Sequence, residues 1–420
     1  MPELVAADPA VRPGYAGRLS RRTAFASISV IFVVFMAASS APSPLYVVYQ
    51  QLWGFSAMTL TVVFAVYVLG LIGSLLVLGA LSDYIGRRPV LAAAIALEAV
   101  ALILFISAGN VPVLVLARLL QGIATGAAMT TLGATLVDLN PPHAPGRAGL
   151  VNGVAPLGGL AVGALGCGAL VQFGPAPTHF VFELLLAGML VAAVFVALMP
   201  ETGVRRPGGR SSLRPRLGVP PRLRPDVLAL VPILIASWAL GGLYLSLGPS
   251  VAASIFGLSN HLVGGLVVTL LCGTGAITAF AVRSWPTARV LAMAAALLTG
   301  GTAVTLLGVQ LGSIGIAAAG TVVAGVGFGA SALGCFGTLA RLAAPQERGE
   351  LFAVVLVISY LAFSLPAVVA GLAATSVGLL ATALVYGSVV VALGAITMII
   401  QWRRRPARRS SALSAAAEQG

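Results

Sequence analysis

Long apolar segments, repeated along almost the whole chain, constrain this sequence more than any other feature. A helix needs about 20 apolar residues to cross a bilayer, and short loops separate segments of that length here. The chain is 59% hydrophobic and 8% charged, whereas soluble domains carry about 25% charged residues. We therefore predict an all-α membrane protein with twelve transmembrane helices. The expected spans are 23–49, 57–79, 88–108, 111–138, 148–173, 179–199, 227–250, 258–282, 287–310, 313–342, 349–373 and 375–402.

Arginine placement supports this count. The chain has no lysine, and 23 of its 24 arginines fall in the tails, the central linker or alternate loops of the twelve-span arrangement. Basic loops stay on the cytoplasmic side of a membrane. We therefore predict a multi-pass protein of the plasma (inner) membrane with both termini cytoplasmic. These loops account for the net charge of +13. We therefore expect the lipid bilayer as a partner and do not expect nucleic acid.

Two motifs resemble signatures of the major facilitator superfamily of secondary transporters. The loop after the second span has the pattern Gly-x3-Asp-x2-Gly-Arg-Arg, which resembles the family's loop 2–3 signature, although Tyr84 replaces a basic residue. The fourth span carries Arg-x2-Gln-Gly-x3-Gly from Arg118 to Gly126, which resembles the helix 4 signature. The resemblance, of the twelve-helix type and similar to drug/proton antiporters, implies two pseudo-symmetric six-helix bundles and rocker-switch alternating access.

The resemblance and the spans together predict the domain organisation. Weak internal similarity supports two related halves, since Pro156 is paralleled by Pro366 and Gly122 by Gly325. We expect a cytoplasmic N-terminal tail at 1–22, a six-helix bundle at 23–199, a cytoplasmic linker at 200–226, a second bundle at 227–402 and a cytoplasmic C-terminal tail at 403–420.

Two ionisable side chains within the spans are candidates for proton coupling. Glu98 falls near the middle of the third span and Arg118 in the fourth. A charged group in the bilayer is costly, so each should be protonated, paired or turned towards a cavity. Glu98 has two open interpretations, a proton-coupling carboxylate or a neutral acid hydrogen-bonded between helices. The two residues could pair, but their rotational phase cannot be read from the sequence.

The charged loop also has two interpretations. By resemblance it forms a conformational latch, in which Asp83 contacts the cytoplasmic start of helix 11 and holds the outward-open state. A bridge between Arg87 and Asp138 would belong to the same latch. The alternative is a simple anchor of topology. The predicted latch residues are Gly79, Asp83, Gly86, Arg87, Arg88 and Asp138.

The resemblance further places the substrate cavity between the halves, along helices 1, 4, 7 and 10. Aromatic, methionine and amide side chains there suit a moderately hydrophobic ligand, cationic or neutral. Aromatic residues near span ends are equally common as interfacial anchors. The candidates are Tyr46, Tyr49, Gln50, Gln121, Thr125, Met129, Asn152, Trp238, Tyr244, Phe328 and Tyr360.

These expectations lead to a transporter that exports a small organic compound in exchange for protons, with proton-coupled import of a metabolite as the alternative. The fifth span resembles an antiporter motif, but Ala155 replaces the glycine that should precede Pro156. A kinked packing helix is an equally good explanation of that span. No nucleotide-binding motif or metal-ligand spacing occurs, so we expect no enzyme activity, no catalytic residues, no metal and no cofactor. The partners are the substrate and protons, and by resemblance the chain works as a monomer.

Overall fold

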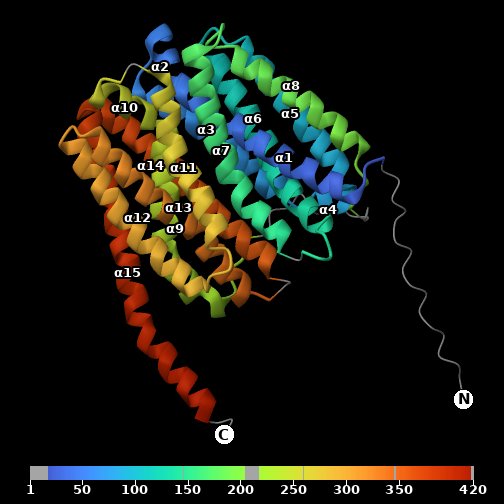
Figure 1. Ribbon diagram of the computed structural model, residues 1–420, viewed down its shortest axis with the longest axis vertical. Coiled ribbons are helices and arrows are strands. Elements are labelled where there is room, and N and C mark those ends of the chain that lie inside the picture. The colour runs from blue at the N-terminus through green and yellow to red at the C-terminus, as the bar shows by residue number, and fades with distance from the viewer. Residues whose placement is uncertain (1–17, 145, 204–216, 259, 345–346, 418–420) are drawn as a thin grey trace, which may run out of the picture.

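Long helices lying side by side form the body of the molecule (Figure 1). The computed structural model describes residues 18–144, 146–203, 217–258, 260–344 and 347–417. Within these residues, twelve helical stretches are long and apolar enough to cross a membrane. This confirms the predicted twelve-span helical fold. Parts of the predicted tails and linker, namely 1–17, 204–216 and 418–420, lie outside the described residues.

The first six spans comprise eight helical elements. They are α1 (Arg21–Ser40), α2 (Pro42–Trp53), α3 (Ala57–Leu78), α4 (Ser82–Ile85), α5 (Arg87–Ile106), α6 (Val111–Asp138), α7 (Arg147–Phe173) and α8 (Phe180–Leu198). The last six comprise the short η2 (Pro221–Leu223), α9 (Arg224–Ser246), α10 (Gly248–Phe256), α11 (His261–Ala281), α12 (Thr287–Gln310), α13 (Ile314–Leu342), α14 (Arg348–Ser376) and α15 (Leu379–Ala417).

Helix ends follow local sequence chemistry, and they do so in parallel in the two halves. Asn110 caps α6 and Ser313 caps α13, each accepting a hydrogen bond from a backbone N–H of the first turn. Gly54 ends α2 with φ 66° and Gly257 ends α10 with φ 65°, the left-handed conformation that glycine tolerates. The two pairs have the same separation along the chain, which supports the predicted internal repeat.

The structure interrupts two spans that were predicted to be continuous. The first span bends at Ala41, where α2 begins with Pro42, and the seventh bends at Leu247, before Gly248 and Pro249 of α10. Proline lacks the N–H that would continue the helix. In addition, α9 begins at Arg224, inside the predicted linker.

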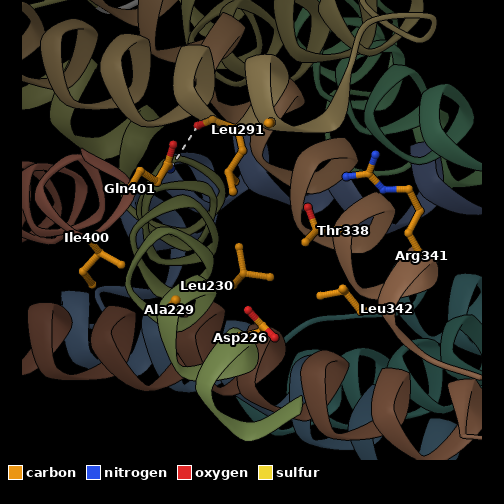
Figure 2. A pocket seen from close by; sticks show the side chains of 10 residues that line it. Asp226, Ala229, Leu230, Leu291, Thr338, Arg341, Leu342, Ile400 and Gln401 are labelled. Atoms are coloured by element: carbon orange, nitrogen blue, oxygen red, sulfur yellow. Dashed lines mark hydrogen bonds between the residues drawn. The ribbon is translucent and has the colours of Figure 1, made fainter. Parts of the chain in front are cut away.

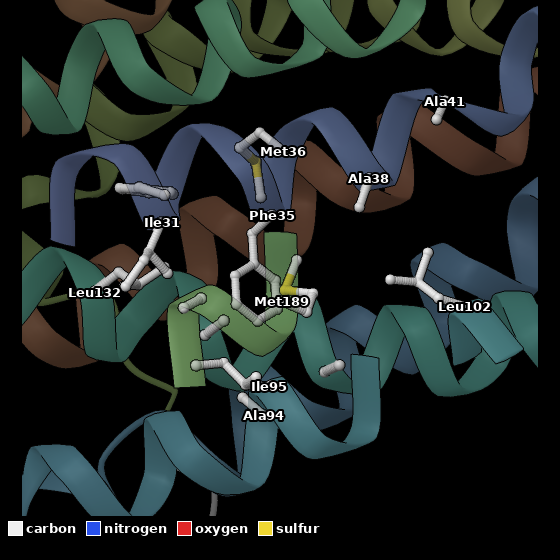
Figure 3. Packing of buried hydrophobic residues seen from close by; sticks show 14 of the residues in the cluster. Ile31, Phe35, Met36, Ala38, Ala41, Ala94, Ile95, Leu102, Leu132 and Met189 are labelled. Carbon is white, nitrogen blue, oxygen red and sulfur yellow. The ribbon is translucent and has the colours of Figure 1, made fainter. Parts of the chain in front are cut away.

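Glycines bring helices of each half into close contact. A Cβ on Gly122 of α6 would overlap the carbonyl oxygen of Tyr67 in α3, and one on Gly329 of α13 would overlap that of Gly275 in α11. Larger side chains fill the remaining gaps. Figure 3 shows Phe35 of α1 beside Met189 of α8, above Ile95 of α5, all buried. The faces of α6 and α13 that carry Gly122 and Gly329 are thus helix-packing surfaces.

The two halves meet at one end of the molecule. We call the end that carries Arg87, Arg147 and Arg348 the arginine-rich end, and the end with the C-termini of α2 and α10 the arginine-poor end. At the arginine-poor end Ser250 donates to Gln50 across the halves at 3.3 Å. There the N–H of His261 also donates to the Gln172 side chain at 3.0 Å. A Cβ on Gly371 of α14 would overlap Thr61 of α3. The arginine-poor end is therefore closed.

We expect Gly122→Ala to destabilise the protein, because the backbone of α3 must move to admit one methyl group. Overpacking of this kind costs roughly 1–3 kcal/mol. Gly166→Ala is the matched control, since no atom lies within 4 Å of a Cβ placed there. Thermal unfolding of both variants in detergent measures the difference. Equal melting temperatures would contradict the close packing of α3 and α6.

Candidate functional site

A cavity of about 420 Å³ lies between the halves. Its residues run from the breaks in the first and seventh spans, at Ser39 of α1 and Leu245 of α9, to Gly149 of α7 and Gly337 of α13 near the arginine-rich end. Across it, the Tyr360 hydroxyl donates to the Met129 sulfur at 3.2 Å. Because the arginine-poor end is closed, the cavity faces the arginine-rich end.

Aromatic rings from α9 and α14 form much of the second-half wall. Trp238 lies with its ring centre 4.9 Å from that of Tyr360 and 5.9 Å from that of Phe363, both edge-on. Phe64 of α3 reaches across from the first half and lies 5.1 Å from Phe363. Such a wall binds apolar or aromatic groups of a ligand.

A buried polar chain adjoins the first-half wall. Arg118 lines the cavity, and its Nη1 donates to the Gln121 side-chain oxygen at 2.5 Å and to the carbonyl of Ser39 at 3.1 Å. Gln121 Nε2 in turn donates to Oε1 of Glu98 at 3.0 Å. Gln121 therefore bridges Arg118 and Glu98. The sequence had left open whether these two residues pair directly.

The hydrogen-bonded side chains of Glu98, Gln121 and Arg118 are shielded from lipid, but two of their polar atoms lack hydrogen-bond partners. Glu98 and Gln121 are fully buried and Arg118 is 1% exposed. The Arg118 guanidinium lies 4.2 Å from the ring centre of Tyr67. Glu98 Oε2 and Arg118 Nε have no hydrogen-bond partner among the residues that the structure describes. Buried polar groups normally have partners, so these two atoms are candidates for contact with water, a proton or a ligand.

Local sequence explains how these groups meet. Arg118 and Gln121 are three residues apart on α6, so they share one face of the helix. The adjacent Gly122 allows α3 to approach, which brings Tyr67 over the guanidinium. The kink between α1 and α2 lies nearby, and the carbonyls of Ala38 and Ser39 just before it accept from Gln121 and Arg118.

The predicted cavity residues divide into two groups. Those that line the cavity are Met129, Asn152, Trp238, Phe328 and Tyr360. The others do not: Tyr46, Tyr49, Gln121 and Thr125 are buried within the first half, Tyr244 is hydrogen-bonded to Thr321 within the second, and Gln50 lies at the arginine-poor end.

The sequence analysis missed several lining residues. Phe64 and Tyr67 come from α3, a helix that was not expected to line the cavity. Phe363 was missed although it lies three residues after Tyr360 and so shares its helix face. That spacing is the signal that would have found it.

The predicted latch residues gather at the arginine-rich end of the first half. Arg87 pairs with Asp83 at 2.5 Å and with Asp138 at 3.1 Å. Arg88 donates to the carbonyl of Ala197. Gly86 has φ 103°, and Gly79 ends α3 beside Thr130.

Asp83 does not have the contact that the resemblance implied. Its carboxylate pairs with Arg87, four residues away, and its side chain is 54% exposed. The ion pairs among the described residues at this end stay within one half, as between Arg222 and Glu347. In this conformation the first residues of α14 are therefore not held by Asp83, which agrees with a cavity open at this end.

Glu201 is a member of this cluster that the sequence analysis overlooked. Its carboxylate accepts hydrogen bonds from the N–H groups of Arg87 at 2.7 Å, Arg88 at 3.1 Å and Gly203 at 2.9 Å. It thereby caps α5, whose N-cap residue Gly86 has no side chain to do so. A Cβ on Gly86 would lie 2.8 Å from this carboxylate.

A second cavity, of about 390 Å³, lies within the second half (Figure 2). It is bordered by α9, α12, α13 and α15, with Asp226 and Arg341 on its rim and Leu230 and Leu291 along its wall. Because none of the described residues of the first half lines it, motion of the halves would not open it to both sides. The first cavity is the better candidate for a transport site.

We expect Glu201→Ala to destabilise the first half, because two N–H groups at the start of α5 lose their acceptor. Loss of such a cap costs about 1 kcal/mol. Glu183→Ala, at an exposed position on α8, is the control and should unfold like the unaltered protein. Thermal unfolding decides between them, and a Glu201→Ala variant as stable as the control would refute the capping role.

Known proteins resemble this chain in sequence and in fold. A family model of the Major Facilitator Superfamily matches residues 28–291. The MFS-type transporter paaT of Penicillium rubens is 34% identical over 142 residues, which are 34% of this chain. Those residues span only 26% of that transporter's length.

Solved structures match over most of their length. A bacterial homologue of the human lysosomal transporter Spinster, inward-facing and unoccupied, has a TM-score of 0.71 and 13% identity, covering 93% of this chain and 98% of its own. The nucleoside transporter NupG has a TM-score of 0.69 and 12% identity, covering 91% and 100%. The human organic anion transporter MFSD10 has a TM-score of 0.65 and 18% identity, covering 90% and 100%.

At these identities the structural matches establish the fold alone, and the family model covers more than half of the chain. The twelve spans and the cavity between two halves agree with both. The chain therefore belongs to the Major Facilitator Superfamily of membrane transporters.

Proposed function

We propose that this protein is a proton-coupled secondary transporter of small organic compounds that works by alternating access. The observation that carries the proposal is the cavity between the halves, closed at one end, with Glu98 buried behind its wall and linked to it through Gln121 and Arg118. An ionisable side chain in the interior of a membrane protein is costly, and where one occurs it usually marks an ion, proton or substrate pathway.

We place the arginine-rich end in the cytoplasm, by the positive-inside rule, and the protein in the plasma (inner) membrane with both termini cytoplasmic. The described conformation is then open to the cytoplasm. The units proposed to rock against each other are the bundles at 23–199 and 227–402. In the opposite conformation the cluster around Asp83 and Arg87 would latch onto the second half and the arginine-poor end would part.

Glu98 is the proposed proton carrier. Its Oε1 accepts from Gln121, and its Oε2 has no partner in the described part of the chain, so the carboxyl can gain or lose a proton without breaking a hydrogen bond. Arg118 connects this carboxyl to the cavity, so protonation of Glu98 and binding of a substrate in the cavity can affect each other. The competing interpretation is a permanently neutral Glu98 that only joins α5 to α6.

Two directions of transport are candidates. Export in exchange for protons follows from the resemblance to drug/proton antiporters. Import together with protons is the second candidate, since Ala155 departs from the antiporter motif. The names of the structural relatives do not distinguish export from import, because they include both a nucleoside transporter and an organic anion transporter.

We expect Glu98→Gln to abolish proton-coupled accumulation while leaving substrate exchange across the membrane intact, because glutamine cannot carry a proton. The assay uses energised inside-out vesicles with a luminal pH dye, tested with lipophilic cations, neutral compounds and small organic acids. Glu183→Gln is the control and should behave like the unaltered protein. Full coupling in Glu98→Gln would overturn the assignment of the proton carrier.

A substrate-triggered release of luminal protons would support export by exchange. Proton movement out of the lumen only together with a substrate leaving it would support cotransport. No proton movement with any substrate that the vesicles transport would contradict proton coupling and leave the family assignment standing.

A further inference from the structure

The charges at the cavity wall are unbalanced. Among the described residues that line the cavity, Arg118 is the one with a full charge, and no carboxylate lines it. The remaining lining is aliphatic, aromatic or neutral polar. A positive site of this kind attracts anions and repels cations, which runs against the cationic or neutral ligand expected from the sequence.

Arg118 is also incompletely bound. Both of its hydrogen bonds, to Ser39 and Gln121, come from Nη1, and both acceptors are neutral. The Tyr67 ring centre lies 4.2 Å from the guanidinium, and Nε has no hydrogen-bond partner within the described ranges. Guanidinium groups bind carboxylates through pairs of N–H donors. Arg118 is thus a buried cation at a ligand cavity that has no anion in direct contact.

Glu98 sets the net charge of this buried group. When Glu98 is ionised, its charge and that of Arg118 cancel across the neutral Gln121. An anion bound to Arg118 would then leave one unbalanced negative charge in the membrane interior, which is costly. Uptake of one proton by Glu98 restores neutrality. Anion binding and protonation of Glu98 therefore favour each other, and this coupling is reciprocal.

Other titratable groups do not change this balance. The groups around Glu98 are Gln121 and Arg118 of α6, Tyr67 of α3 and the backbone of α1 near Ser39. On α8, which also packs against α5, the ionisable residue Glu183 is exposed at the far end of the helix. Glu98 is therefore the group positioned to balance a bound anion.

Resting on proton coupling as proposed above, we propose that the substrate is a small amphipathic organic monoanion that crosses the membrane together with one proton. Its charged group binds Arg118 of the first half, and its apolar body packs against Trp238, Tyr360 and Phe363 of the second. The proton enters Glu98 from the water on the side to which the cavity opens and leaves on the other side. The anion therefore contacts both halves, and the net charge moved is zero.

The test compares three probes with the same ring and different charge: 2-naphthoate, 2-naphthamide and 2-naphthylmethylamine. Binding to the full chain in lipid nanodiscs is followed by tryptophan fluorescence, since Trp238 lies in the cavity. Proton uptake is recorded in parallel in weakly buffered solution. We expect naphthoate to bind at least tenfold more tightly than the amide or the amine, with uptake of one proton for each anion bound.

Two sets of variants separate the parts of the proposal. Glu98→Gln should still bind naphthoate but without proton uptake, and the affinity should lose its dependence on pH. In the unaltered protein the affinity for naphthoate should rise as the pH falls, by up to about tenfold per pH unit, the limit for one linked proton. Arg118→Gln should lose at least tenfold in affinity for naphthoate and none for naphthamide. Arg118→Lys keeps the charge and controls for misfolding.

Three results would overturn the proposal. They are binding of the amide or amine as tight as that of the acid, anion binding without proton uptake, and no binding of any probe in the millimolar range. Tight amine binding with proton release would instead support export by exchange, so the anion proposal can fail while proton-coupled transport stands. The absence of proton coupling with every transported substrate in vesicles would contradict both the anion proposal and proton-coupled transport.

Discussion

Lipid is as apolar as the interior of this protein, so burial of apolar side chains gives its helices little reason to associate. The helices instead pack through close backbone contacts that only small residues permit. Gly122 against Tyr67, and Gly329 against Gly275, are contacts of this kind within the halves. Between the halves, Gly265 of α11 meets Ala164 of α7 in the same way near the arginine-poor end. The closed end is thus held by small, smooth surfaces.

Smooth contacts of this kind suit an interface that must form and part repeatedly. Among the described residues, few hydrogen bonds join the halves towards the arginine-poor end. Two lie at helix ends, from Ser250 to Gln50 and from His261 to Gln172, and a third runs from Thr269 of α11 to the carbonyl of Ala161 in α7. Within the first half, by contrast, Arg87, Asp138 and Glu201 tie α4, α5, α6 and the segment after α8 into one unit. Strong polar ties inside a half and weak ones between halves are what rocking of rigid units requires.

The same constraint explains where charge occurs within the membrane. A buried ionisable group must be compensated, and in the described spans Glu98 and Arg118 meet this need together through one glutamine. The arrangement leaves one oxygen and one nitrogen without partners. Gln121 connects the proposed proton site with the proposed anion site, so a single change in protonation alters the charge that a substrate meets.

The sequence was sufficient for the twelve spans, because span length and arginine placement are set directly by the bilayer. It was insufficient for the cavity, because helices that are apolar on every side carry no periodic signal for the face that turns inward. Tyr46 and Tyr49 therefore appeared equivalent to Trp238, although they are buried in the first half. Gln121 could not be recognised as a bridge, since that role depends on the rotation of α5 against α6.

Alternating access is the central claim, and distances between spin labels in nanodiscs test it most directly. One pair, at Ile85 and Leu342, spans the arginine-rich end, and the other, at Leu52 and Leu311, spans the arginine-poor end; all four positions are exposed. The buried Cys167, Cys272 and Cys335 would be replaced by alanine. We predict two populations, in which one distance lengthens as the other shortens, with a ratio that depends on pH and loses that dependence in Glu98→Gln. A single population at every pH, or two distances that change in the same sense, would contradict the account.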